Sequence, residues 1–268
     1  MNRSKLFIGI FIAVILIVIT IILLTCTVFV VREVKVESDV SSYLLDEEAI
    51  VESSGLSIGR SIISISKEKV KLSIEKENPY VEVLGIHRVF PNKVVIETTV
   101  RMGVMIIASS DGESYAFLDS SLKVLSVMDK EAKSATEATI LRGVTFHVPE
   151  GGAASLVGTK ITLSDPSCGE LLAEIAEFTS DYDLEGQSFS ALFKEITFDT
   201  DNPGLVYIRT NKGVTLVLDK SLSSTIYDQM YICLYYYTTS KDVTMDRTKG
   251  YIAFDKTKNV YTWSESLD

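Results

Sequence analysis

The stretch from Val34 to Val104 constrains the fold most, because strand, cap and turn signals follow one another there in one readable order. It predicts a strand, two helices and then a hairpin. The first helix is expected between an N-cap at Asp46 and a C-terminal glycine at Gly55. The second is expected to begin near Ser66 and to end before Pro79, since the residue before a proline disfavours the α region. The stretch therefore predicts a complete small α/β unit.

The hairpin is predicted from two runs at residues 81–89 and 93–100, with Pro91 placed as in a type I turn. Alternation of apolar and polar residues in the second run indicates a sheet with one covered face. Arg88 shares a strand face with Ile86 and Phe90. We expect its stem to cover apolar surface and its head to stay in water, although contact with an acidic partner is the alternative. The expected core residues are Val36, Ile50, Leu56, Ile62, Val70, Ile74, Val81, Ile86 and Ile96.

An uncharged apolar run of 26 residues without proline extends from Leu6 to Val31. About 20 such residues cross a bilayer as a helix, so the run predicts a transmembrane helix. A cleaved signal peptide is the alternative, but its apolar region is shorter, roughly 7–15 residues, and ends in small residues that are missing here. We therefore expect an uncleaved anchor at residues 6–31, a short cytoplasmic head at residues 1–5 and an extracytoplasmic remainder. Basic residues flank both ends of the run, so charge alone leaves its orientation open.

Beyond residue 101, short strand signals predict a second, mostly antiparallel mixed β domain at residues 102–268 that also contains two helices. One helix is expected after Asp165 and Pro166, and a longer one from about Ser221. Tyrosines in the longer helix are expected to pack at the rim of the core, with an aromatic binding surface as the alternative. Residues 129–139 read as a loop or frayed helix. The expected strands are at residues 104–109, 114–119, 122–127, 140–146, 195–199, 205–210, 214–219, 242–245, 251–254 and 260–263.

Charge and chemistry exclude several classes of function. The net charge of −10 gives no electrostatic attraction to nucleic acid or to anionic lipid. No histidine or cysteine lies at ligand spacing, so neither a metal nor a cofactor is expected. Cys168 and Cys233 are expected to be small buried residues, with a disulfide as the alternative.

Two S-x-x-K strings, Ser64 to Lys67 and Ser120 to Lys123, would suit an acyl-serine enzyme of the cell wall. The companion K-T-G and S-D-N motifs are missing. We therefore expect no catalytic residues, and we keep an acyl-serine envelope enzyme as an alternative function.

The order of anchor, α/β unit and strand-rich domain resembles the FtsQ/DivIB family of bacterial cell-division proteins. The α/β unit, taken as residues 32–101, resembles that family's POTRA domain. The run from Arg88 to Ile96 is the most specific part of the resemblance. Asn78-Pro79-Tyr80-Val81 and the later segment at residues 115–125 extend it, whereas the family's usual Glu-Arg-Pro is missing at residues 100–103.

This resemblance implies a non-catalytic scaffold of the division septum, held in the cell membrane. The implied partners are FtsL-like and FtsB/DivIC-like bitopic division proteins and, through them, the septal wall synthase. Nucleic acid and small-molecule substrates are not expected. A POTRA-bearing assembly or transport protein is a further alternative function.

The partner-binding site is predicted at the C-terminal edge of the distal domain, between Asp242 and Phe254, because a last strand readily leaves an unpaired edge. The resemblance implies the same place and a mode in which the partner adds a strand. Residues 260–263 could themselves pair with this strand and move the free edge outward, and that alternative stays open. The predicted partner-binding residues are Val243, Met245, Tyr251, Ile252, Ala253 and Phe254.

Overall fold

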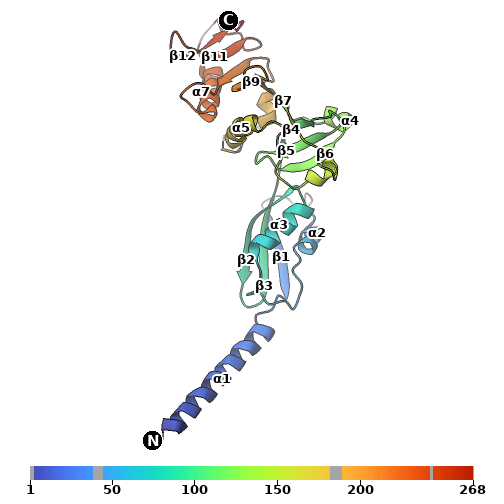
Figure 1. Cartoon of the computed structure of the whole chain (residues 1–268), viewed down its shortest axis with the longest axis vertical. Helices are drawn as coiled ribbons and strands as arrows, with labels where there is room; N and C mark the ends of the chain where they lie inside the picture. The colour runs from blue at the N-terminus through green and yellow to red at the C-terminus, as the bar shows by residue number, and fades with distance from the viewer. Residues whose placement is uncertain (1–2, 39–44, 182–188, 242–243, 268) are drawn as a thin grey trace. The chain divides into compact units, whose positions relative to one another are not determined.

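The computed structural model describes residues 3–38, 45–181, 189–241 and 244–267 (Figure 1). The chain divides into two compact units, Met1–Arg101 and Met102–Asp268. Each unit has its own hydrophobic core, so each is considered by itself.

The first unit begins with the helix α1 (Arg3–Thr27), which is rich in Ile, Leu and Val. Exposed large apolar side chains lie along this helix from Phe7 to Leu23, and their exposed fractions range from 41 to 69%. In the part of the chain that the structure describes, no helix has the length and hydropathy of a membrane span, so the expected transmembrane helix at residues 6–31 is not confirmed.

The rest of the first unit has the predicted order of elements. Its five elements are β1 (Glu33–Ser38), α2 (Glu47–Ser53), α3 (Lys67–Glu77), β2 (Val81–Val89) and β3 (Lys93–Val100). The sheet order is β1-β3-β2, with β1 parallel and β2 antiparallel to the central β3. The expected β-α-α-β-β unit is therefore present.

Local signals set the helix ends. The Asp46 carboxylate accepts a hydrogen bond from Ala49 N at 3.0 Å and so caps α2. Gly55, with φ of +63°, follows that helix as expected. The Ser66 hydroxyl caps α3 in the same way. A turn lies at residues 90–92, as expected, and its Phe90–Pro91 peptide bond is cis.

All nine predicted core residues belong to the hydrophobic core of this unit. The expectation for Arg88 is wrong in one respect: its guanidinium donates to Ile65 O at 2.5 Å, so its head is bound to the protein rather than left to water. Arg88 therefore connects β2 to the segment before α3.

A buried carboxylate links α3 to the end of the sheet. Glu75 is only 7% exposed, and its Oε1 accepts a hydrogen bond from Val83 N at 3.1 Å. Arg101 Nη2 lies 3.3 Å from the same oxygen, and Lys71 Nζ donates to Val83 O at 2.8 Å. These contacts satisfy the backbone of β2 at its bulge, where an edge strand would otherwise expose it.

The second unit is built on one mixed sheet in the order β12-β11-β10-β9-β8-β7-β4-β5-β6. Parallel pairs join β4 to β7, β7 to β8 and β10 to β11, and the other pairs are antiparallel. The strands are β4 (Gly103–Ser109), β5 (Tyr115–Asp119), β6 (Val124–Met128), β7 (Thr139–Phe146), β8 (Phe193–Phe198), β9 (Leu205–Thr210), β10 (Thr215–Asp219), β11 (Tyr251–Asp255) and β12 (Val260–Ser264).

Close approach of β7 and β8 requires a glycine. A Cβ at Gly143, where φ is +73°, would lie 2.0 Å from Phe198 O. Thr139 strengthens the same junction, because its hydroxyl donates to Phe193 O at 2.7 Å. These contacts hold together strands that are far apart in the sequence.

The described residues of this unit form two long α-helices, as predicted, and two short ones. They are α4 (Lys130–Ser134), α5 (Gly169–Asp181), α6 (Phe189–Leu192) and α7 (Ile226–Thr239), and α5 follows the short 3-10 helix η3 (Pro166–Cys168). α7 begins about five residues later than expected, with Thr225 as its N-cap.

Contacts between α5 and α7 organise the core of the second unit. The Glu174 carboxylate on α5 accepts from Ile226 N at 2.7 Å, so it neutralises the N-terminus of α7. The rings of Phe178 and Tyr227 meet edge to face at 5.3 Å. Cys168 and Cys233 are free and buried, as expected, and burial raises the pKa of both thiols.

Candidate functional site

The open edge of the distal sheet is β12. All five residues of β12 pair with β11 on one side, and β12 ends the strand order. The opposite edge strand, β6, is partly covered, since Val124 N donates to Thr159 O at 2.9 Å and Gly158 N donates to Val124 O at 2.8 Å. β12 contains no lysine or proline, the residues that usually protect an edge. It is therefore the edge best suited to receive another strand.

The predicted edge strand, residues 251–254, is not the edge. β11 pairs with β10 through Tyr251 and Ile252 and with β12 along its whole length, so the alternative of an outward shift of the edge is the correct one. The expected strand at residues 242–245 is also wrong where it can be seen, because Thr244 and Met245 are not in a strand; Asp242 and Val243 lie outside the described residues.

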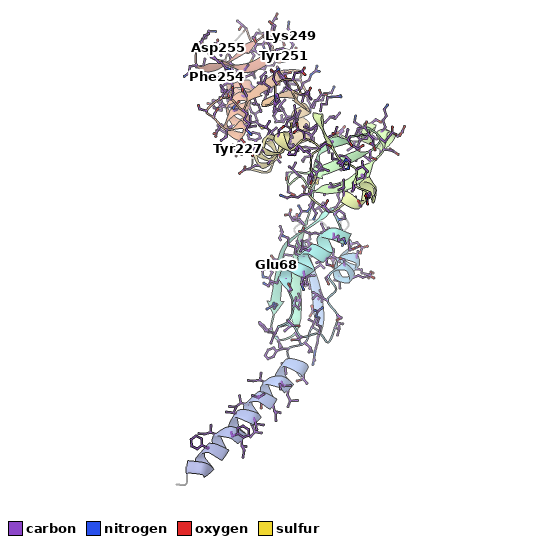
Figure 2. The ribbon with its side chains drawn as sticks, in the orientation of Figure 1. Glu68, Tyr227, Lys249, Tyr251, Phe254 and Asp255 are labelled. Atoms are coloured by element: carbon purple, nitrogen blue, oxygen red, sulfur yellow. The ribbon has the colours of Figure 1, made fainter. Side chains whose placement is uncertain are left out.

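The side chains of the predicted site residues divide into buried and half-buried groups. Met245 and Ile252 are buried in the core of the second unit and present no side chain to a partner. Tyr251, Ala253 and Phe254 are half-buried next to the open edge (Figure 2). Their partner-binding role stays a prediction, and the strand beside them offers the free backbone.

An apolar groove of about 430 Å³ lies between α7 and the β11–β12 hairpin. We call it the edge groove. Its walls include Ile232, Tyr235, Phe254, Val260 and Tyr261, with Thr239 and Asn259 among the few polar side chains. The Phe254 and Tyr261 rings meet edge to face at 5.3 Å across the two strands. Apolar side chains of an added segment could enter this groove while its backbone pairs with β12.

The turn between β11 and β12 is held by one carboxylate. Asp255 accepts hydrogen bonds from the Thr257 hydroxyl at 2.6 Å and from Thr257 N at 2.9 Å, and Lys258 Nζ lies 3.0 Å away. The Thr257 hydroxyl, followed by Lys258, holds the pKa of Asp255 far below its usual range. Burial raises the pKa of Tyr261 in the edge groove to about 12. These contacts of Asp255 hold the turn of the hairpin that carries the open edge.

Two tyrosines of α7 do not pack in the core as expected. Tyr231 and Tyr235 are exposed and stack on each other, with ring centroids 6.5 Å apart. Tyr237 is buried, as the packing expectation requires. The spacing of four residues between Tyr231 and Tyr235, on the helix face away from Met230 and Leu234, was the signal that could have revealed them. One face of α7, beside the edge groove, therefore carries exposed aromatic rings, while the binding role of that face stays a prediction.

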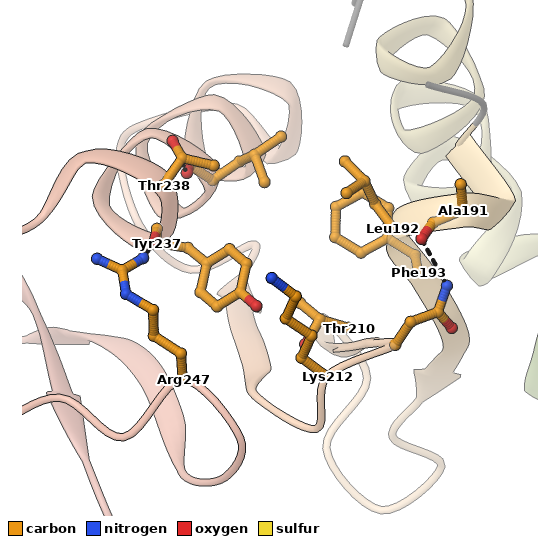
Figure 3. Close-up of a pocket in the computed structure, with 10 residues that line it drawn as sticks. Ala191, Leu192, Phe193, Thr210, Lys212, Tyr237, Thr238 and Arg247 are labelled. Carbon is orange, nitrogen blue, oxygen red and sulfur yellow. Dashed lines mark hydrogen bonds between the residues drawn. The ribbon is translucent and has the colours of Figure 1, made fainter. Parts of the chain in front are cut away.

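A second pocket, of about 380 Å³, lies between the C-terminal half of α7 and the strands β8 and β9 (Figure 3). Lys212 and Tyr237 point toward one another within it, and Arg247 donates to Tyr237 O and to Ser240 O. The Thr210 hydroxyl is buried in the wall with no hydrogen-bond partner in the described part of the chain. The basic residues of the lining are Lys212 and Arg247.

The S-x-x-K serines lie in local hydrogen-bonded turns. The Ser64 hydroxyl donates to Ser61 O at 3.0 Å. Ser120 lies in a turn where Asp119 Oδ1 accepts from Lys123 N and from the Ser121 hydroxyl, both at 2.8 Å. Within the described residues, no group of three or more potential metal ligands comes together.

The β-α-α-β-β order, the sheet order β1-β3-β2 and the helix pair α2–α3 define the first unit as a POTRA domain. Residues 29–99 match the family model described as "POTRA domain, FtsQ-type". The match covers this domain only, so it identifies an FtsQ-type POTRA domain within the chain. A search among curated proteins found no match.

Proposed function

We propose that the protein is a membrane-anchored, non-catalytic scaffold of bacterial cell division that binds small bitopic division proteins through the open edge of its distal sheet. The FtsQ-type POTRA match supports the division role. The single observation that carries the binding mode is the unprotected edge of β12 beside the edge groove. The partner contributes one strand, paired with β12, and apolar side chains that fill the groove.

The anchor is proposed from the sequence. The uncharged run that begins at Leu6 supports one membrane span with the N-terminus in the cytoplasm, the two structured units outside, and a position at the division septum. The span is proposed to end with α1 at Thr27 rather than at Val31, because Val31 is buried in the core of the POTRA domain. The partners are FtsL-like and FtsB/DivIC-like proteins, through which the scaffold is linked to the septal wall synthase. The resemblance to FtsQ/DivIB proteins supports these identities.

Photo-crosslinking in dividing cells tests the binding mode. A photoreactive phenylalanine at Thr262 of β12 or at Tyr235 of the edge groove is expected to crosslink to a small bitopic protein, identified by mass spectrometry. The matched control places the same photoreactive phenylalanine at Ser126 on β6, the partly covered edge strand at the other end of the sheet. Crosslinks to the division proteins from Ser126 and none from Thr262 would refute the proposed edge.

A substitution pair separates binding from folding. Tyr235→Ser removes a groove ring that is 58% exposed and is expected to reduce recovery of the partner without unfolding the chain. Tyr80→Ser, at a half-exposed tyrosine of the POTRA domain, is the control and should leave recovery unchanged. Ile252→Pro is unsuitable, because Ile252 is completely buried and its loss would damage the core itself.

A further inference from the structure

The membrane-proximal end of the POTRA domain exposes a group of large apolar side chains. They come from three segments: the residues after α1, the loop before α3, and the end of β2 with the turn that follows it. We call this group the basal patch: Val28, Ile58, Ile63, Val89 and Phe90. Ile58 is 77% exposed and Phe90 is 57% exposed, which is unusual for side chains of this size at the end of a folded domain.

Backbone hydrogen bonds bring the three segments together directly after α1. Val31 N donates to Arg60 O at 2.8 Å, and Ile62 N donates to Phe29 O at 3.0 Å. Arg32 N donates to Asn92 O at 2.8 Å, which ties the β2–β3 turn to the same place. The Phe29 and Phe90 rings meet edge to face at 5.8 Å. The patch is therefore fixed within a few residues of Thr27, where α1 ends.

The charges beside the patch are basic, although the chain as a whole carries −10. Arg32 and Arg60 are both exposed, and neither has a carboxylate partner among the described residues. Arg32 Nη2 makes one contact, to Thr27 O at 3.4 Å. The nearby Lys93 is neutralised by Glu33 at 2.7 Å. Exposed arginines beside apolar side chains suit an interface with phosphate groups on one side and hydrocarbon on the other.

We propose that the basal patch lies in the surface of the membrane that holds α1, with its apolar side chains below the phosphate groups and Arg32 and Arg60 among them. This inference rests on the proposed anchor, because α1 brings the patch to the bilayer. Val28 of the patch follows, five residues further on, Leu23, the last exposed large apolar side chain described on α1, and this closeness to the proposed anchor favours lipid over a protein partner. Docking fixes the POTRA domain against the membrane instead of leaving it on a free tether.

Site-directed spin labelling of the full chain in phosphatidylcholine–phosphatidylglycerol nanodiscs tests the proposal. Cys26→Ser removes a native cysteine, whereas the buried Cys168 and Cys233 stay. Single labels are placed at Ile58→Cys in the patch and at Leu72→Cys on α3. Leu72 is the matched control, since it is an equally exposed apolar residue (68%) of the same domain outside the patch.

The readout is collision of each label with oxygen, which concentrates in lipid, and with a water-soluble nickel chelate. At Ile58, oxygen collisions are expected to exceed nickel collisions, and at Leu72 the order is expected to reverse. A label at Ile15→Cys on α1 reports on the anchor separately. Lipid exposure at Ile15 with water exposure at Ile58 would overturn the docking proposal alone. Water exposure at both positions would overturn the anchor as well.

A second label at Phe90→Cys guards against a local effect of the Ile58 substitution. Phe90 belongs to another segment of the patch, so the same lipid exposure is expected there. Protection at Ile58 from both reagents, with oxygen also excluded, would mean that protein rather than lipid covers the patch, and it would likewise overturn the proposal.

Discussion

Truncation of Ile74 to alanine gives the most direct test of how the POTRA domain is held together. Ile74 lies on α3, is completely buried, and belongs to the core that α2, α3 and the sheet share. The change removes three carbon atoms. At about 0.8 kcal/mol for each buried methylene, the transfer free energy alone amounts to about 2.4 kcal/mol. The cavity left behind brings the expected loss to about 2–5 kcal/mol.

Leu72→Ala is the matched control, because Leu72 is on the same helix and 68% exposed. Its expected effect is within about 0.5 kcal/mol, as for surface substitutions away from special features. Hydrogen exchange of the intact chain, followed by mass spectrometry on peptides from α3 and β3, measures the free energy of opening in this unit alone. A loss of 2 kcal/mol or more corresponds to exchange at least about 25-fold faster.

Equal exchange rates in the two variants would refute the reasoning, because they would mean that the buried face of α3 does not hold the domain together. Faster exchange in β11 and β12 as well as in the POTRA peptides would contradict the view that each unit has its own core. The expected result is acceleration confined to residues before 102.

Three further outcomes are expected. Glu75→Gln should destabilise the POTRA domain by about 1–3 kcal/mol, measured by the same exchange assay. The change weakens a buried acceptor for Val83 N and removes a negative charge beside the Arg101 guanidinium. Absorbance titration should show one tyrosine that ionises near pH 12, and this ionisation should be missing in Tyr261→Phe. Because a tyrosine in the unfolded chain ionises near pH 10, the free energy of unfolding should fall as the pH rises above about 10. The pKa of Asp255 is lowered in the folded chain, so its carboxylate stabilises the β11–β12 turn above about pH 4, and this stabilisation is lost on further acidification. NMR of the turn amides should show the loss, and the Asp255→Asn variant should not show this pH dependence.

Much of the POTRA domain could be predicted from the sequence because its signals are local. Caps at Asp46 and Ser66, the glycine at Gly55 and the proline at Pro79 each act within one turn of their own position. The spacing of apolar residues then indicated which faces are buried, and all nine core predictions were confirmed. The hydrogen bond from Arg88 to Ile65 O was not predicted, since it depends on segments that meet only after folding.

The candidate site could not be predicted in the same way, because which strand forms the edge depends on the order of all strands in the sheet. The sequence determined that residues 251–254 and 260–263 form strands, but the prediction that residues 251–254 form the edge was wrong. Only the tertiary structure decided that β12 is outermost, that Ile252 is buried beneath α7, and that Tyr235 faces outward beside Val260. The physical reason is that strand propensity and periodicity are set by neighbouring residues, whereas exposure of a backbone edge or an aromatic ring depends on what distant segments leave uncovered.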